Sequence, residues 1–307
     1  MTQRPMKIGL LLPDTEGYMA GQTAHWPDLL AMTREAERVG FDSVWVTDHF
    51  LQRDEKGERG PWECWSLVAA LAAVTSRVEI GTLVLCTGFR NPAHLAKMAE
   101  TVDDISNGRL ILGIGAGWHE PEYTAFGYPF DHRVDRFAEA TEIITTLVRT
   151  GALDFDGRWY SARDCVLRPR GPRPQGMPIL IGTGASGERM MQLAARYGDS
   201  WNAWFGSFAN NVDELRALLG RVDDACAAVG RDPQSLERSV ALKIALEPGV
   251  ASPMSTNAVD GPDEEIASTL RAVAALGIAH VQLWIDPCTV ESVIRFQLVL
   301  DLLDQRM

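Results

Sequence analysis

The residues best suited to chemistry in this chain are an aspartate and a histidine that stand side by side. Asp48 and His49 follow the apolar run Ser43–Val46, which has the length and composition of a buried strand. A carboxylate beside an imidazole can hold one tautomer of the ring, so the histidine can act as an acid or a base near neutral pH. The alternative is structural: Asp48 caps the next segment, and His49 bonds to a neighbouring loop.

A loop of small residues is the second candidate site. It follows the predicted strand Pro178–Ile181 and contains Gly182, Thr183, Gly184, Ala185, Ser186 and Gly187. Such a loop leaves backbone N–H groups uncovered at the positive end of the next helix, where a phosphate group binds well. The loop lacks the Gly-Lys-Ser/Thr ending of a Walker motif, and the alternative is an ordinary tight turn between a strand and a helix.

The run Gly113-Ile114-Gly115-Ala116-Gly117 resembles a dinucleotide-binding fingerprint, but its context disagrees. Those glycines begin inside the predicted strand Leu110–Gly115, whereas the fingerprint needs a glycine-rich turn that leads directly into a helix. Glycines within a strand indicate instead a bulge, or a surface that another group approaches closely.

Composition excludes several classes of function. The net charge is −12 and no basic cluster is present, which argues against a nucleic-acid or anionic-membrane partner. Six histidines occur without an H-E-x-x-H pattern, so we expect no metal site. The five cysteines lack any C-x-x-C spacing and are interpreted as free thiols of a cytoplasmic protein. The N-terminal apolar run is too short for a signal peptide, and no run is long enough to span a membrane.

Eight predicted strands alternate with eight predicted helices. The strands are Lys7–Leu12, Ser43–Val46, Glu79–Leu85, Leu110–Gly115, Pro178–Ile181, Ser200–Ala203, Arg238–Leu246 and Ala279–Ile285. The helices are Pro27–Val39, Trp62–Thr75, Pro92–Ser106, His132–Arg149, Gly187–Tyr197, Val212–Val229, Pro262–Leu276 and Val290–Leu303.

This alternation predicts an α/β fold, a (β/α)8 TIM barrel that forms a single domain over residues 1–307. Residues 151–175 break the pattern and are expected to form an insertion with a small hairpin, between the fourth helix and the fifth strand. A doubly wound sheet is the alternative. In a barrel the active site lies at the carboxyl ends of the strands, where Asp48, His49, Cys86, Gly117 and Gly182 would lie.

Four stretches together resemble the luciferase-like monooxygenase superfamily, and within it the branch that uses the deazaflavin coenzyme F420. They are 43–50, 81–97, 108–118 with Glu122, and 179–182 with 194–199. The resemblance covers nearly the whole chain. It implies a barrel enzyme that transfers a hydride between F420 and a small organic substrate. An FMN-dependent two-component monooxygenase and a non-catalytic flavin-binding barrel are the alternatives.

The resemblance also implies roles for individual residues. His49 would be the catalytic proton donor, and Asp48 would contact the deazaflavin together with Cys86, Ala116 and Gly117. The loop Gly182, Thr183, Gly184, Ser186 and Gly187 would hold the phosphate of the cofactor. A non-prolyl cis peptide is expected at Leu83–Val84, in a bulge that supports one face of the ring.

Two further expectations concern the substrate and the partners. Glucose-6-phosphate dehydrogenases of the F420 branch carry a catalytic glutamate where this chain has Trp118, a difference that argues against a sugar phosphate as the substrate. Barrels of this family commonly form dimers, and the segment with Trp62, Trp65, Leu67 and Leu71 is apolar on more than one side. We therefore expect a homodimer.

Overall fold

The computed structural model describes residues 4–55, 57–184, 187–246 and 257–304. The chain divides into two compact units, and each is described by itself. Unit 1 comprises residues 1–45, 183–196 and 200–307, and unit 2 comprises residues 46–182 and 197–199. That residues 1–307 form a single domain therefore stays a prediction.

Unit 1 holds the first and last parts of the chain. Its elements are β1 (Lys7–Leu11), α1 (Trp26–Val39), most of β2 (Ser43–Val46), α6 (Glu188–Tyr197) up to Arg196, β11 (Ser200–Ala203), α7 (Val212–Ala228), β12 (Glu237–Ala245), α8 (Asp263–Ala275), β13 (His280–Asp286), α9 (Val290–Arg295) and α10 (Gln297–Asp304), with short 3-10 turns at Phe205–Ser207 and Pro233–Ser235. The helix predicted over Val290–Leu303 is thus two helices. Helix α1 packs on α9, and α8 packs on α10.

Unit 2 holds the middle of the chain. Its elements are β3 (Gln52–Asp54), β4 (Gly57–Arg59), α2 (Cys64–Val74), β5 (Glu79–Thr82), β6 (Leu85–Cys86), the 3-10 turn η1 (Thr87–Phe89), α3 (Pro92–Ile105), β7 (Leu110–Gly115), α4 (Glu120–Phe126), α5 (Arg133–Thr150), β8 (Ala152–Asp156), β9 (Ser161–Val166) and β10 (Ile179–Gly182). The hairpin β3–β4 and helix α4 were not predicted.

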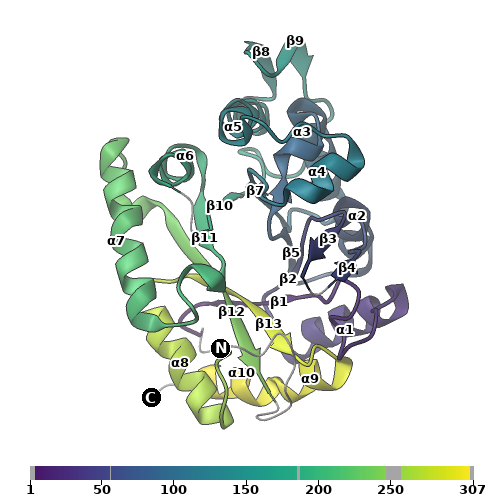
Figure 1. Cartoon of the computed structure of the whole chain (residues 1–307), viewed down its shortest axis with the longest axis vertical. Coiled ribbons are helices and arrows are strands. Elements are labelled where there is room, and N and C mark those ends of the chain that lie inside the picture. Colours follow the sequence, from purple (N-terminus) through teal and green to yellow (C-terminus); the bar gives the residue numbers. More distant parts are fainter. Residues whose placement is uncertain (1–3, 56, 185–186, 247–256, 305–307) are drawn as a thin grey trace. The chain divides into compact units, whose positions relative to one another are not determined.

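The strands follow the order of a (β/α)8 barrel. The main sheet runs β10-β11-β12-β13-β1-β2-β5-β7-β6, and β10 also pairs with β7 (Figure 1). In the described chain, β5 and β6 together take the place of one predicted strand. Counted as one, they give eight strands that follow one another around the sheet in chain order. The pairings are parallel, as in β1 with β13 and β12 with β13. The predicted fold is confirmed.

The predicted insertion is present. Strands β8 and β9 pair antiparallel with a register shift between Leu153 and Phe155. Two ion pairs hold the segment after the hairpin against α3. Arg170 contacts Glu100 at 3.1 Å, and Arg173 pairs with the buried carboxylate of Asp103. These contacts fix the path of the chain from the hairpin to β10.

The strand predicted over Glu79–Leu85 is interrupted between β5 and β6. The peptide bond between Leu83 and Val84 is cis, which confirms the expectation drawn from the family resemblance. Within unit 2, Val84 then lies against the glycines of the neighbouring strands. A Cβ atom placed on Gly115 would be 2.7 Å from Val84 Cγ2, and one on Gly182 would be 2.9 Å from the same side chain.

The glycines of β7 are therefore explained by the bulge. A Cβ atom on Gly113 would lie 1.9 Å from the backbone oxygen of Thr82, and Thr82 also bonds to Gly113 through its hydroxyl group. The interpretation of the Gly113–Gly117 run as a place of close approach is correct.

We expect Gly113→Ala and Gly115→Ala to lower the free energy of unfolding by about 1–3 kcal/mol or more, because each adds a methyl group to filled space. Urea unfolding measures the loss. Val84→Ala should recover stability in the Gly115→Ala background, where the clash is with a side chain, and not in Gly113→Ala, where it is with the backbone. The control is Gly220→Ala in α7, where an added Cβ would meet no described atom within 4 Å. An equally small effect at all three glycines would contradict this account.

Candidate active site

Three strand ends of unit 2 position the candidate residues. Asp48 and His49 follow β2, Cys86 ends β6, and Ala116 and Gly117 follow β7. Helix α3 is fixed nearby because the side chain of its N-cap residue, Asn91, accepts hydrogen bonds from the next turn at 3.0 and 3.1 Å. Arg90 directly precedes this N-cap residue, so the cap fixes the backbone from which the Arg90 side chain extends.

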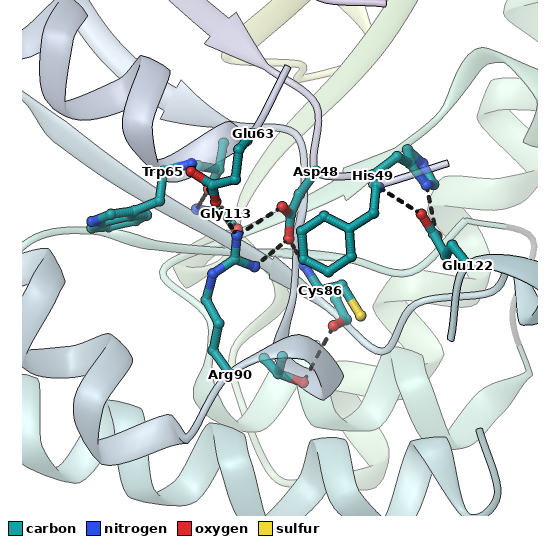
Figure 2. Close-up of polar contacts among 12 residues, drawn as sticks. Asp48, His49, Glu63, Trp65, Cys86, Arg90, Gly113 and Glu122 are labelled. Carbon is teal, nitrogen blue, oxygen red and sulfur yellow. Dashed lines mark hydrogen bonds and ion pairs between the residues drawn. The ribbon is translucent and has the colours of Figure 1, made fainter. Parts of the chain in front are cut away.

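Asp48 is the centre of a buried network of charges (Figure 2). Its two carboxylate oxygens accept hydrogen bonds from Nη1 and Nη2 of Arg90 at 2.6 and 3.0 Å. The same carboxylate accepts the backbone N–H of Cys86 at 2.8 Å. Arg90 also donates to Glu63, the N-cap residue of α2, at 2.7 Å. The network thus joins the loop after β2 to β6, α2 and the start of α3.

Electrostatics favour the ionised forms of Arg90 and Glu63. Burial alone would lower the pKa of Arg90, but the charge and hydrogen bonds of Asp48 outweigh burial and raise it. Burial alone would raise the pKa of Glu63, yet hydrogen bonds from Ser66, Trp65 and Arg90 lower it. Arg90 and Glu63 therefore both favour their charged forms when they are paired.

His49 pairs with a different carboxylate. Its Nδ1 lies 2.9 Å from Oε1 of Glu122, whose side chain is 1% exposed. The other oxygen of Glu122 accepts the backbone N–H of Phe50 at 2.8 Å. An ionised carboxylate only accepts hydrogen bonds, so Nδ1 of His49 carries the proton in this pair and the lone pair of the neutral ring lies on Nε2.

This arrangement corrects one sequence-based hypothesis. The tautomer of His49 is set by Glu122, not by its neighbour Asp48, which is committed to Arg90 and Cys86. The sequence indicates Glu122 only as one of the residues that carry the family resemblance. Glu122 lies in the first turn of α4, and because no hydrophobic period marks this short helix, the residues alone carried no signal for this partner of His49.

The thiol of Cys86 lies inside a small aromatic cluster. Its sulfur is 2.8 Å from the hydroxyl of Tyr123, which in turn donates to the backbone oxygen of Ala116 at 3.0 Å. Phe89, Phe50 and Tyr128 pack on the same cluster. Burial raises the pKa of the Cys86 thiol to about 12, and the pKa of Tyr123 is raised as well, first by burial and then by Cys86.

We expect Cys86 to resist alkylation. Since only the thiolate reacts, a pKa of about 12 leaves Cys86 protonated at pH 8 and lowers its reactivity by at least about a hundredfold relative to an exposed cysteine. Mass spectrometry after timed treatment with iodoacetamide should show Cys165, which is partly exposed, modified long before Cys86. Modification of Cys86 at the same rate as Cys165 would contradict the buried pair with Tyr123.

Close packing explains why Gly117 is a glycine. A Cβ atom there would lie 2.1 Å from the Tyr123 hydroxyl and 2.6 Å from Cys86 Sγ, and the residue has a φ of +71°. The structure therefore brings together Cys86, Ala116 and Gly117 through Tyr123. Within unit 2 they form one small-residue surface after β6 and β7, on which Ala116 and Gly117 are partly exposed and Cys86 is buried.

The candidate phosphate loop begins at the end of β10. In unit 1, Thr183 is buried, and its hydroxyl accepts the indole N–H of Trp201 at 2.9 Å. A Cβ atom on Gly184 or Gly187 would meet no described atom within 4 Å, so there is room beside both glycines. Ser186 lies outside the described residues. The room beside Gly184 and Gly187 fits the approach of a phosphate group.

The described residues hold no group of three or more histidine, cysteine, aspartate or glutamate side chains suited to a metal ion. None of the helices in the described part of the chain is long and apolar enough to cross a bilayer.

Comparison with known proteins identifies the family. The model of the luciferase-like monooxygenase family matches residues 6–252. The chain belongs to this family. F420-dependent glucose-6-phosphate dehydrogenase of Amycolatopsis mediterranei is 32% identical over 237 residues, which are 75% of this chain and 69% of that protein. Pyrimidine monooxygenase RutA of Methylorubrum extorquens is 33% identical over 247 residues, 75% of this chain and 64% of RutA.

The chain thus spans about two thirds of the length of these relatives. A solved F420-dependent secondary alcohol dehydrogenase, bound to an F420–acetone adduct, has a TM-score of 0.78 at 20% identity and covers 96% of this chain and 98% of its own. Riboflavin lyase with modified FMN has a TM-score of 0.77 at 15% identity and covers 97% and 91%. These structures show the shared fold. Together the family model and these relatives indicate an enzyme of the luciferase-like monooxygenase family.

Proposed function

We propose that this enzyme transfers a hydride between coenzyme F420 and a small organic substrate, with His49 as its acid–base group. The observation that carries the proposal is the pair of the buried Glu122 and the partly exposed His49 at the carboxyl end of β2, the end of a barrel at which enzymes place their active sites. Similarity to the F420-dependent dehydrogenase of Amycolatopsis mediterranei supports the choice of the deazaflavin.

The chain offers two surfaces that fit such a cofactor. In unit 2, the small-residue surface of Cys86, Ala116 and Gly117 suits a flat ring. In unit 1, the room beside Gly184 and Gly187 suits a phosphate group. When bound, F420 supplies or accepts a hydride and reacts poorly with oxygen. The remaining requirements are orientation of the reactants and one proton, both of which fall to the protein.

His49 provides that proton. In the reducing direction the protonated imidazole donates from Nε2 to the substrate oxygen, while Glu122 holds the Nδ1–H and stabilises the positive charge. In the oxidising direction the neutral ring accepts the proton at the same atom. Asp48, whose oxygens already hold Arg90 and the Cys86 N–H, fixes the backbone that carries His49. Contact of Asp48 with the cofactor stays a proposal.

A kinetic assay tests the proposal. Purified protein is mixed with reduced or oxidised F420 and a panel of enones, ketones and alcohols, and the absorbance of oxidised F420 is followed. We expect turnover with at least one substrate class.

The second candidate, an FMN-dependent monooxygenase, is favoured by the similarity to RutA. It would be supported if turnover requires reduced FMN and oxygen and never F420.

We also propose that the chain forms a homodimer. Trp65 and Leu71 are buried in the chain itself, which leaves Trp62, 44% exposed, and the partly exposed Leu67 as the apolar residues available to a partner. Sedimentation at micromolar concentration should give twice the chain mass of 33.8 kDa, and a purely monomeric profile would contradict the dimer.

A further inference from the structure

Trp118 has an unusual combination of exposure and fixed position. Its indole is 66% exposed, although large aromatic side chains are normally well covered. The same ring makes an edge contact with His49, with centroids 5.7 Å apart, and another with His119 at 5.0 Å. His119 is itself held, because its Nε2 accepts the backbone N–H of Arg53 at 3.0 Å. The indole therefore contacts both imidazoles, and most of its surface is exposed.

Three charged groups that contact residues 48, 49 and 117 already have partners. Glu122 is occupied by His49 and the Phe50 N–H. Arg133 donates to the backbone oxygen of Gly117 at 2.6 Å and lies 4.2 Å over the ring of Phe130. Arg90 is paired with Asp48. To pair with a phosphorylated substrate, Arg90 or Arg133 would have to leave these contacts, whereas an apolar ring would only cover the exposed indole.

We infer that Trp118 is a specificity-determining residue that stacks on the substrate and selects a neutral, planar carbonyl compound or the matching alcohol. This inference rests on the proposed function, since His49, the ring that Trp118 touches, is the proposed acid–base group. Stacking of two flat rings strengthens their contact beyond what the buried area alone provides. Trp118 would hold the conjugated part of the substrate, so that its carbonyl oxygen lies near the imidazole.

The hydride and the proton of this reaction are both accounted for. In reduction the carbonyl carbon would receive the hydride that reduced F420 supplies, the C=O π bond would break, and the oxygen would take the proton of His49. The products are an alcohol, oxidised F420 and neutral His49, which regains its proton from water. In the reverse direction an alcohol loses the hydride to F420 and its O–H proton to His49.

A matched pair of ligands tests the role of Trp118 without any cofactor. Acetophenone is planar and conjugated, whereas cyclohexyl methyl ketone has the same carbon skeleton with a puckered ring. Calorimetric titration of the purified protein should show tighter binding of acetophenone by up to roughly tenfold. In Trp118→Ala this preference should disappear, and in Trp118→Phe part of it should remain. The control Leu298→Ala, at a 53% exposed position of α10, should keep the full preference.

The same pair of ketones is then assayed with reduced F420. Trp118→Ala should raise KM for acetophenone by about the factor lost in affinity and change kcat by less than about threefold, because His49 and Glu122 remain. An unchanged ligand preference in Trp118→Ala, or no preference in the unmodified protein, would overturn the inference. Failure of the proposed function has a different signature: the ligand preference depends on Trp118, but F420 is never turned over.

Discussion

Replacing His49 with alanine should lower turnover by at least about 10²-fold, the usual effect of removing an acid–base group. The imidazole is the group that Glu122 orients at 2.9 Å, and the variant leaves the carboxylate without a proton donor at that position. Binding of the cofactor should change little, because the surface formed by Cys86, Ala116 and Gly117 is untouched. Steady-state kinetics and a cofactor titration on the same preparation measure the two quantities.

Two controls sharpen this result. His132→Ala removes an exposed imidazole, at 46% side-chain exposure, and should leave turnover unaltered. Glu122→Gln keeps the size of the side chain but removes its charge, and should cost less than His49→Ala because a neutral amide still accepts the Nδ1–H. If His49→Ala retains full turnover, His49 is not the acid–base group. If no cofactor-linked turnover is found at all, the non-catalytic flavin-binding barrel becomes the better account.

Replacing Arg90 with glutamine should lower the free energy of unfolding by about 3–5 kcal/mol, the usual loss when one partner of a buried ion pair is removed. The side chain of Asp48 is 0% exposed and receives two hydrogen bonds from Arg90, so the variant leaves a buried negative charge without its counter-ion. Urea unfolding followed by circular dichroism gives the loss.

A double-mutant cycle separates the ion pair from packing. Asp48→Asn removes the charge and keeps an oxygen for the Cys86 N–H, so the variant with both changes should be clearly more stable than the sum of the single losses predicts. The surface control is Arg163→Gln, because Arg163 and Asp156 are 75% and 73% exposed, and a loss below about 0.5 kcal/mol is expected there. Equal losses at Arg90 and Arg163, or strictly additive losses at Asp48 and Arg90, would contradict the network.

The barrel could be predicted because its signals are local. Short apolar runs such as Leu110–Gly115 and Ser200–Ala203 have the bounds that the pattern indicated, and Asn91-Pro92 marks the start of α3 as expected. Helix α4 and the hairpin β3–β4 were missed. Both are only a few residues long and carry no clear hydrophobic period.

The partners within the candidate site could not be derived from the residues alone. Glu122 lies 73 positions from His49 in the sequence, and Arg90 lies 42 from Asp48. Adjacent residues in a sequence invite pairing, yet Asp48 and His49 bond to different partners. Which of several carboxylates reaches an imidazole depends on how strand ends meet in three dimensions, and hydrophobic periodicity carries no information on that point.

The central claim is the use of F420, and equilibrium binding tests it most directly. The purified protein is titrated separately with oxidised F420 and with FMN, and the change in fluorescence of each cofactor is followed to saturation. The account predicts saturable binding of F420 with a Kd at least about tenfold below that for FMN. Saturable binding of FMN with weaker binding of F420, or with none, would contradict it.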